Sequence, residues 1–393
     1  MKTAFEKPFV SGKKFLKFII LQSIDSLAIK EPRLPKGKTL LLVRLDAIGD
    51  YILFRNFLEI LRNSQRYKDY NITLCGNRAW QDLAETFDKK FVNDFIWIDK
   101  KKFIRSPYYR YEVLNNISRR GFEAAIQPNL SREYYYGDAI IRASGSPERI
   151  GSSGDLGNME VWQKEISDKY YTKLIPAESN NVLEFLRNKE FFEKLLGVKI
   201  DINKPQIDMN YLNKEKPAAG NYAIIFPGAR NERKRWSTDR FAEIADYLSA
   251  KYGLKILIAG SQIDKKLSNK IIYEARHTDI NDLTGKTTLS EITRLISRAN
   301  LVVSNDTFAA HIAAAVNTKI VYLLTGDHLG RFGPYPKDSR DKVYYLYPKE
   351  IMEKLDSDFD YLTEKFKYES NLEVNSIKVE EVKRLIDEAM KSR

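Results

Sequence analysis

Short runs of consecutive apolar residues alternate along this chain with segments of helical periodicity. Such runs predict strands that are buried on both faces, and their alternation with helices predicts parallel sheets with crossover connections. Eight runs fit this description: 39–43, 71–75, 95–98 and 122–126 in the first half, and 222–226, 255–259, 301–303 and 320–324 in the second. The pattern restarts at 222, so we expect two α/β domains in succession.

The length of 393 residues also favours two domains of about 150 residues or more each. The expected organisation is a basic segment at 1–38, a Rossmann-like domain at 39–203, a linker at 204–220, a second Rossmann-like domain at 221–375 that faces the first across a cleft, and a C-terminal helix at 376–393. The single cysteine, Cys75, excludes an internal disulfide framework and fits a reducing, cytoplasmic compartment. One cysteine and three histidines also argue against an all-protein zinc site.

The N-terminal end of the chain is basic. Residues 1–45 hold eight Lys and two Arg against three acidic residues, a balance of +7 within the formal net charge of +12. The apolar run at 15–21 is far shorter than the ~20 residues that a membrane-spanning helix needs. Two interpretations stay open. The run is either a helix on the anionic inner face of a membrane, or a helix whose apolar side packs on the first domain while its lysines are solvated.

Three loops that follow predicted strands are candidates for a ligand site, because ligands of parallel sheets bind beyond the carboxyl ends of the strands. The first loop, 44–50, ends in Gly49 and Asp50. Gly49 permits a tight turn, and by spacing alone Asp50 is expected to cap the next helix. The loop is neither the GxGxxG dinucleotide pattern nor a Walker A motif, so those two classes of site are poorly supported.

The other two loops carry groups that suit a phosphate ligand. In 227–236, four cations fall within six residues, which matches the charge of a diphosphate. In 304–311, Asn305 or Asp306 is expected to cap an alanine-rich helix, and Thr307 with the amides that follow makes an anion site. Taken alone, His311 at the end of this loop is better interpreted as a core residue.

Together these loops resemble glycosyltransferase family 9, the bacterial heptosyltransferases of lipopolysaccharide assembly. Three motifs carry the resemblance: an Arg-x(4)-Gly-Asp element at Arg44, Gly49 and Asp50, a basic loop ending in Lys-x-Trp at Lys234 and Trp236, and an Asn-Asp-Thr-Gly-x-x-His signature at 305–311. In the signature, Phe308 stands where the family has glycine. The resemblance covers roughly residues 41–62 and 222–336.

The resemblance implies a GT-B fold and an inverting transfer of a sugar from a nucleotide-diphosphate donor, with no cofactor and no essential metal. The donor sugar would be a heptose or a related sugar, with ADP-heptose as the family's donor. The acceptor would be lipopolysaccharide or another cell-surface glycan, lipid-linked and bound by the first domain. The implied roles are Asp50 as general base, Lys234 as the cation that steadies the departing diphosphate, Arg44 and Gly49 at the acceptor, and Arg230, Asp264, Asp306, Thr307, Phe308, Ala309 and His311 at the donor.

Other interpretations stay open beside this one. The same fold could take a hexose donor and a different glycan acceptor, or be a non-catalytic scaffold that binds a partner. The basic net charge suggests nucleic acid, but no helix-turn-helix, zinc pattern or basic stretch interleaved with aromatics occurs, so we expect no nucleic-acid partner. Asp356-Ser357-Asp358 has the spacing that metal-dependent glycosyltransferases of another fold use. No core strand precedes it, so we interpret it as a solvated loop.

Overall fold

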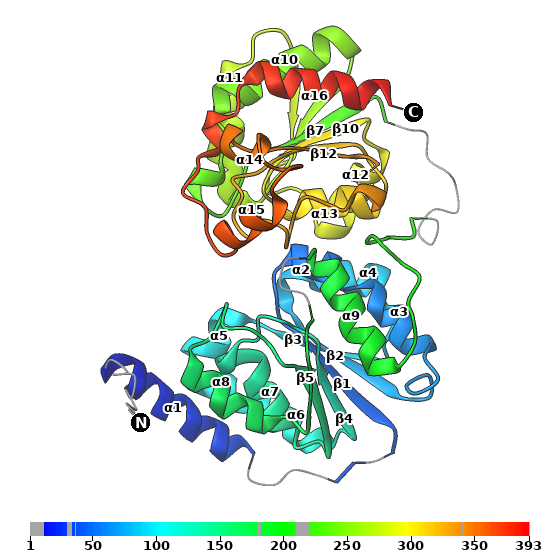
Figure 1. Ribbon diagram of the computed structural model, residues 1–393, viewed down its shortest axis with the longest axis vertical. Helices are drawn as coiled ribbons and strands as arrows, with labels where there is room; N and C mark the ends of the chain where they lie inside the picture. The colour runs from blue at the N-terminus through cyan, green and yellow to red at the C-terminus, as the bar shows by residue number, and fades with distance from the viewer. Residues whose placement is uncertain are drawn as a thin grey trace. The chain divides into compact units, whose positions relative to one another are not determined.

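The computed structural model describes residues 12–29, 34–35, 37–178, 182–209, 220–339 and 341–392. Contacts divide the chain into two compact units, each with its own six-stranded parallel sheet (Figure 1). Unit 1 holds the described residues up to Leu45, Arg66–Ala79 and Val92–Pro176, and unit 2 holds Asp46–Gln65, Trp80–Phe91 and the described residues from Ala177 onward. None of the described helices is both long enough and apolar enough to span a membrane.

The sheet of unit 1 has the strand order β3-β2-β1-β4-β5-β6. Its strands are β1 (Thr39–Arg44), β2 (Asn71–Asn77), β3 (Asp94–Ile98), β4 (Ala124–Gln127), β5 (Glu148–Ser152) and β6 (Lys173–Ile175). Its helices are α1 (Gly12–Ala28), α5 (Lys100–Arg105), α6 (Pro107–Arg120), α7 (Ala139–Ser144) and α8 (Val161–Ser167). The central strands β1 and β4 contribute fully buried side chains to a core shared with α6 and α7.

The sheet of unit 2 repeats this arrangement in the order β12-β11-β10-β7-β8-β9. Its strands are β7 (Tyr222–Phe226), β8 (Lys255–Ile258), β9 (Ile280–Asp282), β10 (Leu301–Asn305), β11 (Ile320–Leu323) and β12 (Val343–Leu346). The helices of unit 2 are α2 (Ile48–Ile52), α3 (Asn56–Asn63), α4 (Gln81–Phe87), α9 (Glu184–Leu196), α10 (Thr238–Tyr252), α11 (Lys265–Glu274), α12 (Leu289–Arg298), α13 (Phe308–Ala315), α14 (Lys349–Met352), α15 (Phe359–Lys365) and α16 (Val379–Lys391). The chain order reverses between β7 and β10, which places a topological switch point there.

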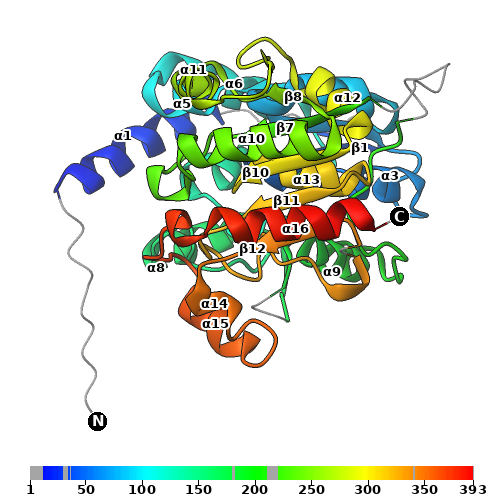
Figure 2. The same cartoon turned by 90° about the horizontal axis from the view of Figure 1, so that it is seen from above.

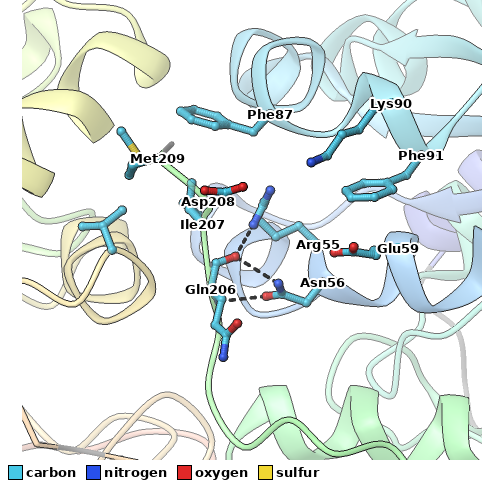
Figure 3. A pocket seen from close by; sticks show the side chains of 11 residues that line it. Arg55, Asn56, Glu59, Phe87, Lys90, Phe91, Gln206, Ile207, Asp208 and Met209 are labelled. Carbon is cyan, nitrogen blue, oxygen red and sulfur yellow. Dashed lines mark hydrogen bonds between the residues drawn. The ribbon is translucent and has the colours of Figure 1, made fainter. Parts of the chain in front are cut away.

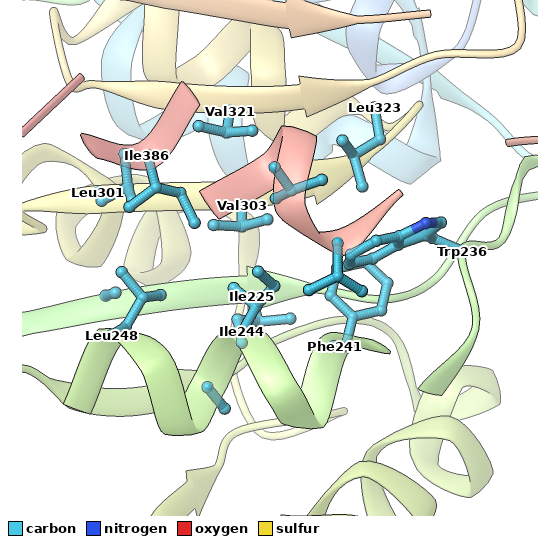
Figure 4. Packing of buried hydrophobic residues seen from close by; sticks show 14 of the residues in the cluster. Ile225, Trp236, Phe241, Ile244, Leu248, Leu301, Val303, Val321, Leu323 and Ile386 are labelled. Atoms are coloured by element: carbon cyan, nitrogen blue, oxygen red, sulfur yellow. The ribbon is translucent and has the colours of Figure 1, made fainter. Parts of the chain in front are cut away.

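Helices α10 and α16 lie side by side over one face of this second sheet (Figure 2). Phe241 and Ile244 of α10 and Ile386 of α16 point toward strand residues such as Val303 and Val321 (Figure 4). All five side chains are essentially inaccessible to solvent. A packed face of this kind holds the carboxyl ends of β7 and β10 in fixed positions, because close-packed cores deform little.

All eight predicted strands are present, and their ends differ from the prediction by at most two residues. Four strands were not predicted: β5, β6, β9 and β12. Three of these lie at sheet edges and the fourth lies beside an edge. Edge strands have one neighbour and more contact with solvent, so they do not require a continuous apolar run. A capping box formed by Thr288 and Glu291 begins α12.

The N-terminal segment contains a helix, α1, which packs against α6 through the side that carries Leu21 and Ala28. Most of the predicted linker, residues 210–219, lies outside the described residues, as do residues 1–11, 30–33 and 36 of the basic segment. The predicted domain boundaries therefore stay predictions.

Candidate functional site

A cavity of about 480 Å³ lies in unit 2 at the carboxyl ends of β7, β8 and β10. Neighbouring strands β7 and β10 meet at the switch point of the sheet, where ligands of such folds bind. The lining residues come from the loops after these strands and from the start of α2. Six residues predicted from the sequence line it: Gly49, Arg230, Asp264, Asp306, Thr307 and Phe308.

The N-terminus of α13 forms part of the cavity wall. Thr307 is the N-cap residue, and its Oγ1 accepts a hydrogen bond from the amide of Ala309 (3.2 Å). The expectation that Asn305 or Asp306 caps this helix is therefore wrong. The remaining amides of a first helical turn lack partners within the helix and carry partial positive charge, which suits an anion.

Asn305 instead ties together the two loops that flank the cavity. Its side chain is buried, donates to the carbonyl oxygen of Pro227 (2.8 Å) and accepts from the amide of Trp236 (3.2 Å). The indole of Trp236 is also buried and donates to the carbonyl oxygen of Ile377 (3.0 Å). These bonds fix both ends of the basic loop 227–236 against β10 and the core.

Two arginines of the basic loop line the cavity, Arg230 and Arg235. Arg230 is exposed, and Arg235 is half-buried with its Nε donating to the carbonyl oxygen of Ala229 (2.9 Å). Guanidinium groups bind phosphate oxygens through paired, directional hydrogen bonds. Arg235 also pairs with the exposed carboxylate of Glu232 (3.5 Å). The cavity wall therefore holds two guanidinium groups and one helix N-terminus that suit an anionic ligand.

Lys234 lies in the same loop, but two carboxylates hold its ammonium group. Nζ is 2.6 Å from Asp306 Oδ2 and 3.1 Å from Asp327 Oδ2, and Tyr322 donates its hydroxyl to Asp306 Oδ1 (2.6 Å). Burial alone would lower the pKa of Lys234, but the two carboxylates outweigh that effect and raise the pKa overall. Lys234 is not among the described residues that line the cavity, but its partner Asp306 does line it.

Asp264 lies at the opposite side of the cavity, at the carboxyl end of β8. Its Oδ2 accepts hydrogen bonds from the amide and the hydroxyl of Ser261, both at 2.8 Å. A Cβ atom at Gly228 would lie 2.4 Å from Asp264 Oδ1, and one at Gly260 would lie 2.9 Å from Oδ2. The carboxylate can occupy this position only because both loop residues lack a side chain.

Gly49 packs on His311 as well as lining the cavity. A Cβ atom at Gly49 would lie 3.0 Å from His311 Cδ2, so α2 and α13 approach closely at this point. His311 is 4% exposed, and its Nδ1 is hydrogen-bonded to the Tyr335 hydroxyl (2.8 Å). Burial lowers the pKa of His311 to about 4, opposed by the nearby charge of Asp306. The imidazole is therefore neutral near pH 7, and its contribution to donor binding stays a prediction.

The remaining predicted residues are near neighbours, along the chain, of residues that line the cavity. Asp50 directly follows three lining residues, is half-buried and lies in the first turn of α2, whose N-cap is Ala47, so Asp50 does not cap the helix. Ala309 is buried in α13. Arg44 ends β1 in unit 1 and is fully buried. Asp50 therefore places a carboxylate directly after the lining residues 47–49.

A second cavity in unit 2, of about 440 Å³, lies beside α3 (Figure 3). Arg55 makes an ion pair with buried Asp88 and donates to the carbonyl oxygen of Gln206. Asn56 exchanges two hydrogen bonds with the Gln206 backbone, at 3.0 and 2.9 Å. The side chains of Arg55 and Asn56 are engaged within the protein and hold the segment before residue 210, so this cavity is the weaker candidate for a ligand site.

The sequence predictions missed the lining residues Gly260, Ser261 and Ile263, and they included Gly228 and Arg235 only as members of the basic loop 227–236. Gly228 and Gly260 each lie two residues past the end of a strand, β7 or β8, a signal that could have identified them. Within the described residues, no cluster of three or more His, Cys, Asp or Glu side chains could hold a metal ion. The Asp356 side chain is 83% exposed, in agreement with the interpretation of that segment as a solvated loop.

Comparison with known proteins bears on both the fold and the family. Lipopolysaccharide heptosyltransferase 3 of Escherichia coli is 31% identical over 202 residues, which cover 48% of this chain and 56% of that protein, so the chain spans about half the length of this relative. The family 9 glycosyltransferase structure from Veillonella parvula DSM 2008 matches with a TM-score of 0.69 at 20% identity, covering 91% of this chain and 99% of the other. E. coli heptosyltransferase WaaC, solved with ADP-2-deoxy-2-fluoro heptose, matches with a TM-score of 0.67 at 15% identity, covering 89% and 99%.

These structural matches show the fold, and the predicted GT-B α/β fold is confirmed. The model of glycosyltransferase family 9 (heptosyltransferase) matches residues 157–354, a range that includes the basic loop, Asp264 and the 305–311 signature. The match covers half of the chain. The chain therefore belongs to glycosyltransferase family 9, the heptosyltransferase family.

Proposed function

We propose that this chain is an inverting glycosyltransferase that moves a heptose or a related sugar from a nucleotide-diphosphate donor to lipopolysaccharide or another cell-surface glycan, without an essential metal. Family membership supports sugar transfer, and a relative with the same fold was solved with an ADP-heptose analogue, which supports an ADP-linked donor. The observation that carries the proposal is the cavity at the ends of β7 and β10, with its two arginines and helix N-terminus.

The charges around the cavity suit a diphosphate. Lys234 with Asp306 and Asp327 forms a cluster of one positive and two negative charges, so it supplies no net positive charge. Arg230 and the N-terminus of α13 supply positive charge, and Arg235, paired with exposed Glu232 at 3.5 Å, adds a second guanidinium group at the cavity wall. We assign the bound diphosphate to these three groups, with Thr307 at the helix N-cap, and we assign to the Lys234 ammonium group the stabilisation of the negative charge that develops as the diphosphate departs. Fixed positive charge of this kind stabilises the negative charge that develops on a departing diphosphate, which makes a metal ion unnecessary.

Asp50 is the proposed general base. An acceptor hydroxyl is a weak nucleophile until a base takes its proton, and a carboxylate is a suitable base. Asp50 follows the lining residues 47–49, and its neighbour Gly49 contacts the first turn of α13. In the proposed reaction Asp50 takes the proton, and the acceptor oxygen attacks the anomeric carbon on the face opposite the diphosphate. The bond to the diphosphate then breaks, and its electron pair leaves with the diphosphate, so the configuration at that carbon inverts.

The other side of the cavity suits the nucleoside. Asp264 Oδ2 is bound by Ser261, and its Oδ1 faces the space that Gly228 leaves open. A carboxylate in this position, after a strand of a nucleotide-binding sheet, suits ribose hydroxyls. Phe308 lines the same cavity, with its ring 6.2 Å edge-to-face from Phe226. We assign Phe308 to the choice of donor, because an aromatic ring here narrows the cavity where the family has glycine.

The test combines ligand binding with turnover. Thermal shift and donor turnover are measured for ADP-, UDP-, GDP-, CMP- and dTDP-linked sugars, with and without EDTA, for the native chain and for Asp50→Asn. We expect one nucleotide class to stabilise the protein, turnover to persist in EDTA, and Asp50→Asn to lose about 100-fold or more of turnover with binding unchanged.

Glu59→Gln is the matched control, since Glu59 is an exposed carboxylate in the first turn of α3 and lies outside the donor cavity. Turnover abolished by EDTA and restored by a metal would overturn the metal-independent mechanism. Donor binding with equal turnover in the native and Asp50→Asn chains would overturn the role of Asp50. Failure of every sugar nucleotide to bind would favour a non-catalytic scaffold.

A further inference from the structure

Buried side-chain contacts within unit 1 fix the rotation of helix α1 about its own axis. Asp25 on its inner side pairs with Arg110 of α6 through two bonds, Nε to Oδ1 at 2.5 Å and Nη2 to Oδ2 at 2.7 Å, and both side chains are almost fully buried. One turn earlier, Gln22 donates to the Tyr134 hydroxyl (2.5 Å). A buried, two-point ion pair is strongly directional, so it determines which face of α1 points away from the unit.

The face that points away is apolar. Phe15, Leu16, Ile19 and Ile20 are 55%, 60%, 44% and 46% exposed, and Leu27, further along the same side, is 52% exposed. Their spacing places them on one side of a helix with 3.6 residues per turn. Single exposed apolar residues are ordinary on a protein surface, but a contiguous group of large ones marks an interaction surface.

The start of α8, with its N-cap Glu160, contacts α1. Lys14 pairs with Glu160 (2.6 Å), and Phe18 packs edge-to-face on Trp162 with ring centroids 5.2 Å apart. Val161 lies between these two contact residues in the chain and is 57% exposed. We call Phe15, Leu16, Ile19, Ile20 and Val161 the α1 surface.

The charge of the N-terminal segment indicates whether the α1 surface binds a second copy of this chain or a lipid surface. By sequence the N-terminal segment 1–45 has a balance of +7, and within α1 the ammonium group of Lys14 pairs with Glu160 while that of Lys17 lies 4.8 Å from the ring centre of Tyr135. A second copy of this chain would bring two such basic segments together, and like charges oppose that pairing. An anionic lipid surface attracts them, while its acyl boundary accepts the apolar side chains.

We infer that the α1 surface docks the protein on an anionic membrane, with α1 in the plane of the interface and its outer side chains in the acyl boundary. The inference is independent of the proposed sugar transfer. The lipid surface binds α1, and this binding does not involve the cavity in unit 2.

Vesicle flotation of the full chain tests this inference. Vesicles of phosphatidylcholine alone are compared with vesicles that contain 30% phosphatidylglycerol, at about 50 and 500 mM salt. We expect binding to the anionic vesicles that weakens at high salt. Phe15→Ser with Ile19→Ser should lower the partition coefficient at least about tenfold, because two exposed apolar side chains no longer enter the lipid.

The matched control is Ile272→Ser with Tyr273→Ser, which removes two exposed apolar residues from α11 in unit 2 and should leave flotation unchanged. Donor turnover and the melting temperature should stay within error of the native chain for both double variants, since neither changes a residue of the cavity. Equal flotation of the native chain and the α1 variant would overturn the inference. Light scattering that shows a native dimer converted to a monomer by Phe15→Ser with Ile19→Ser would overturn it in favour of a second copy.

Discussion

Replacing Lys234 by methionine separates its structural contribution from its contribution to sugar transfer. Methionine has a similar length but no charge, so Asp306 and Asp327 lose the cation that lies between them. At an effective dielectric constant of about 20, the gross attraction is about 6 kcal/mol at 2.6 Å and about 5 kcal/mol at 3.1 Å. The cost of removing three charges from water offsets much of this.

The net cost of Lys234→Met should be about 3 kcal/mol in the free energy of unfolding. Losing one partner of a fully buried pair costs ~3–5 kcal/mol, and these three side chains are 17%, 17% and 11% exposed, which favours the lower end. In a chain of 393 residues the melting temperature should fall by roughly 4 °C, because the entropy of unfolding is about 2.1 cal/mol/K per residue. Calorimetry and urea titration measure the change.

Turnover should fall about 100-fold or more in Lys234→Met, as expected for the loss of a cation that stabilises the departing diphosphate. The second variant, Lys234→Met with Asp327→Asn, removes one of the two opposed carboxylates and should recover most of the lost stability. It should not recover turnover, because the cation is still absent. Recovery of turnover together with stability would refute a direct role of Lys234 in the transfer step and leave it only the positioning of Asp306.

Three further outcomes are expected. Burial lowers the pKa of His311 to about 4, whereas the unfolded chain binds that proton near pH 6.5, so the free energy of unfolding should fall by up to about 3 kcal/mol as the pH drops from 6.5 to 4. In urea titrations at several pH values, His311→Asn should reduce this dependence of stability on pH. Phe308→Gly should change which sugar nucleotide gives the largest thermal shift, at a cost of about 1 kcal/mol from glycine in the first turn of α13, and an unchanged ranking of donors would contradict its proposed role. Asp25→Ala should cost about 3–5 kcal/mol by leaving buried Arg110 unpaired and should speed hydrogen exchange in α1, whereas native-like exchange would show that the ion pair does not hold the helix.

The sequence determined the elements with a strong local pattern. The central strands β1, β4, β7 and β10 are buried on both faces, so each requires a continuous apolar run, which is visible without any knowledge of its neighbours. The carboxyl ends of parallel strands meet at one edge of a sheet, and for this reason the loops 227–236 and 304–311 could be assigned to one site before the structure was known. The motifs in these loops also identified the family.

Only the tertiary structure determined which charged groups of that site line the cavity and which pair with other side chains. The sequence places four cations in one loop, but the fold directs Arg230 and Arg235 to the cavity and commits Lys234 to two carboxylates, one of them 93 positions away in the chain. The orientation of α1 was also undetermined, because helical periodicity defines an apolar face without saying whether protein or another surface covers it. Both outcomes depend on contacts between residues far apart in sequence, and no local pattern encodes such contacts.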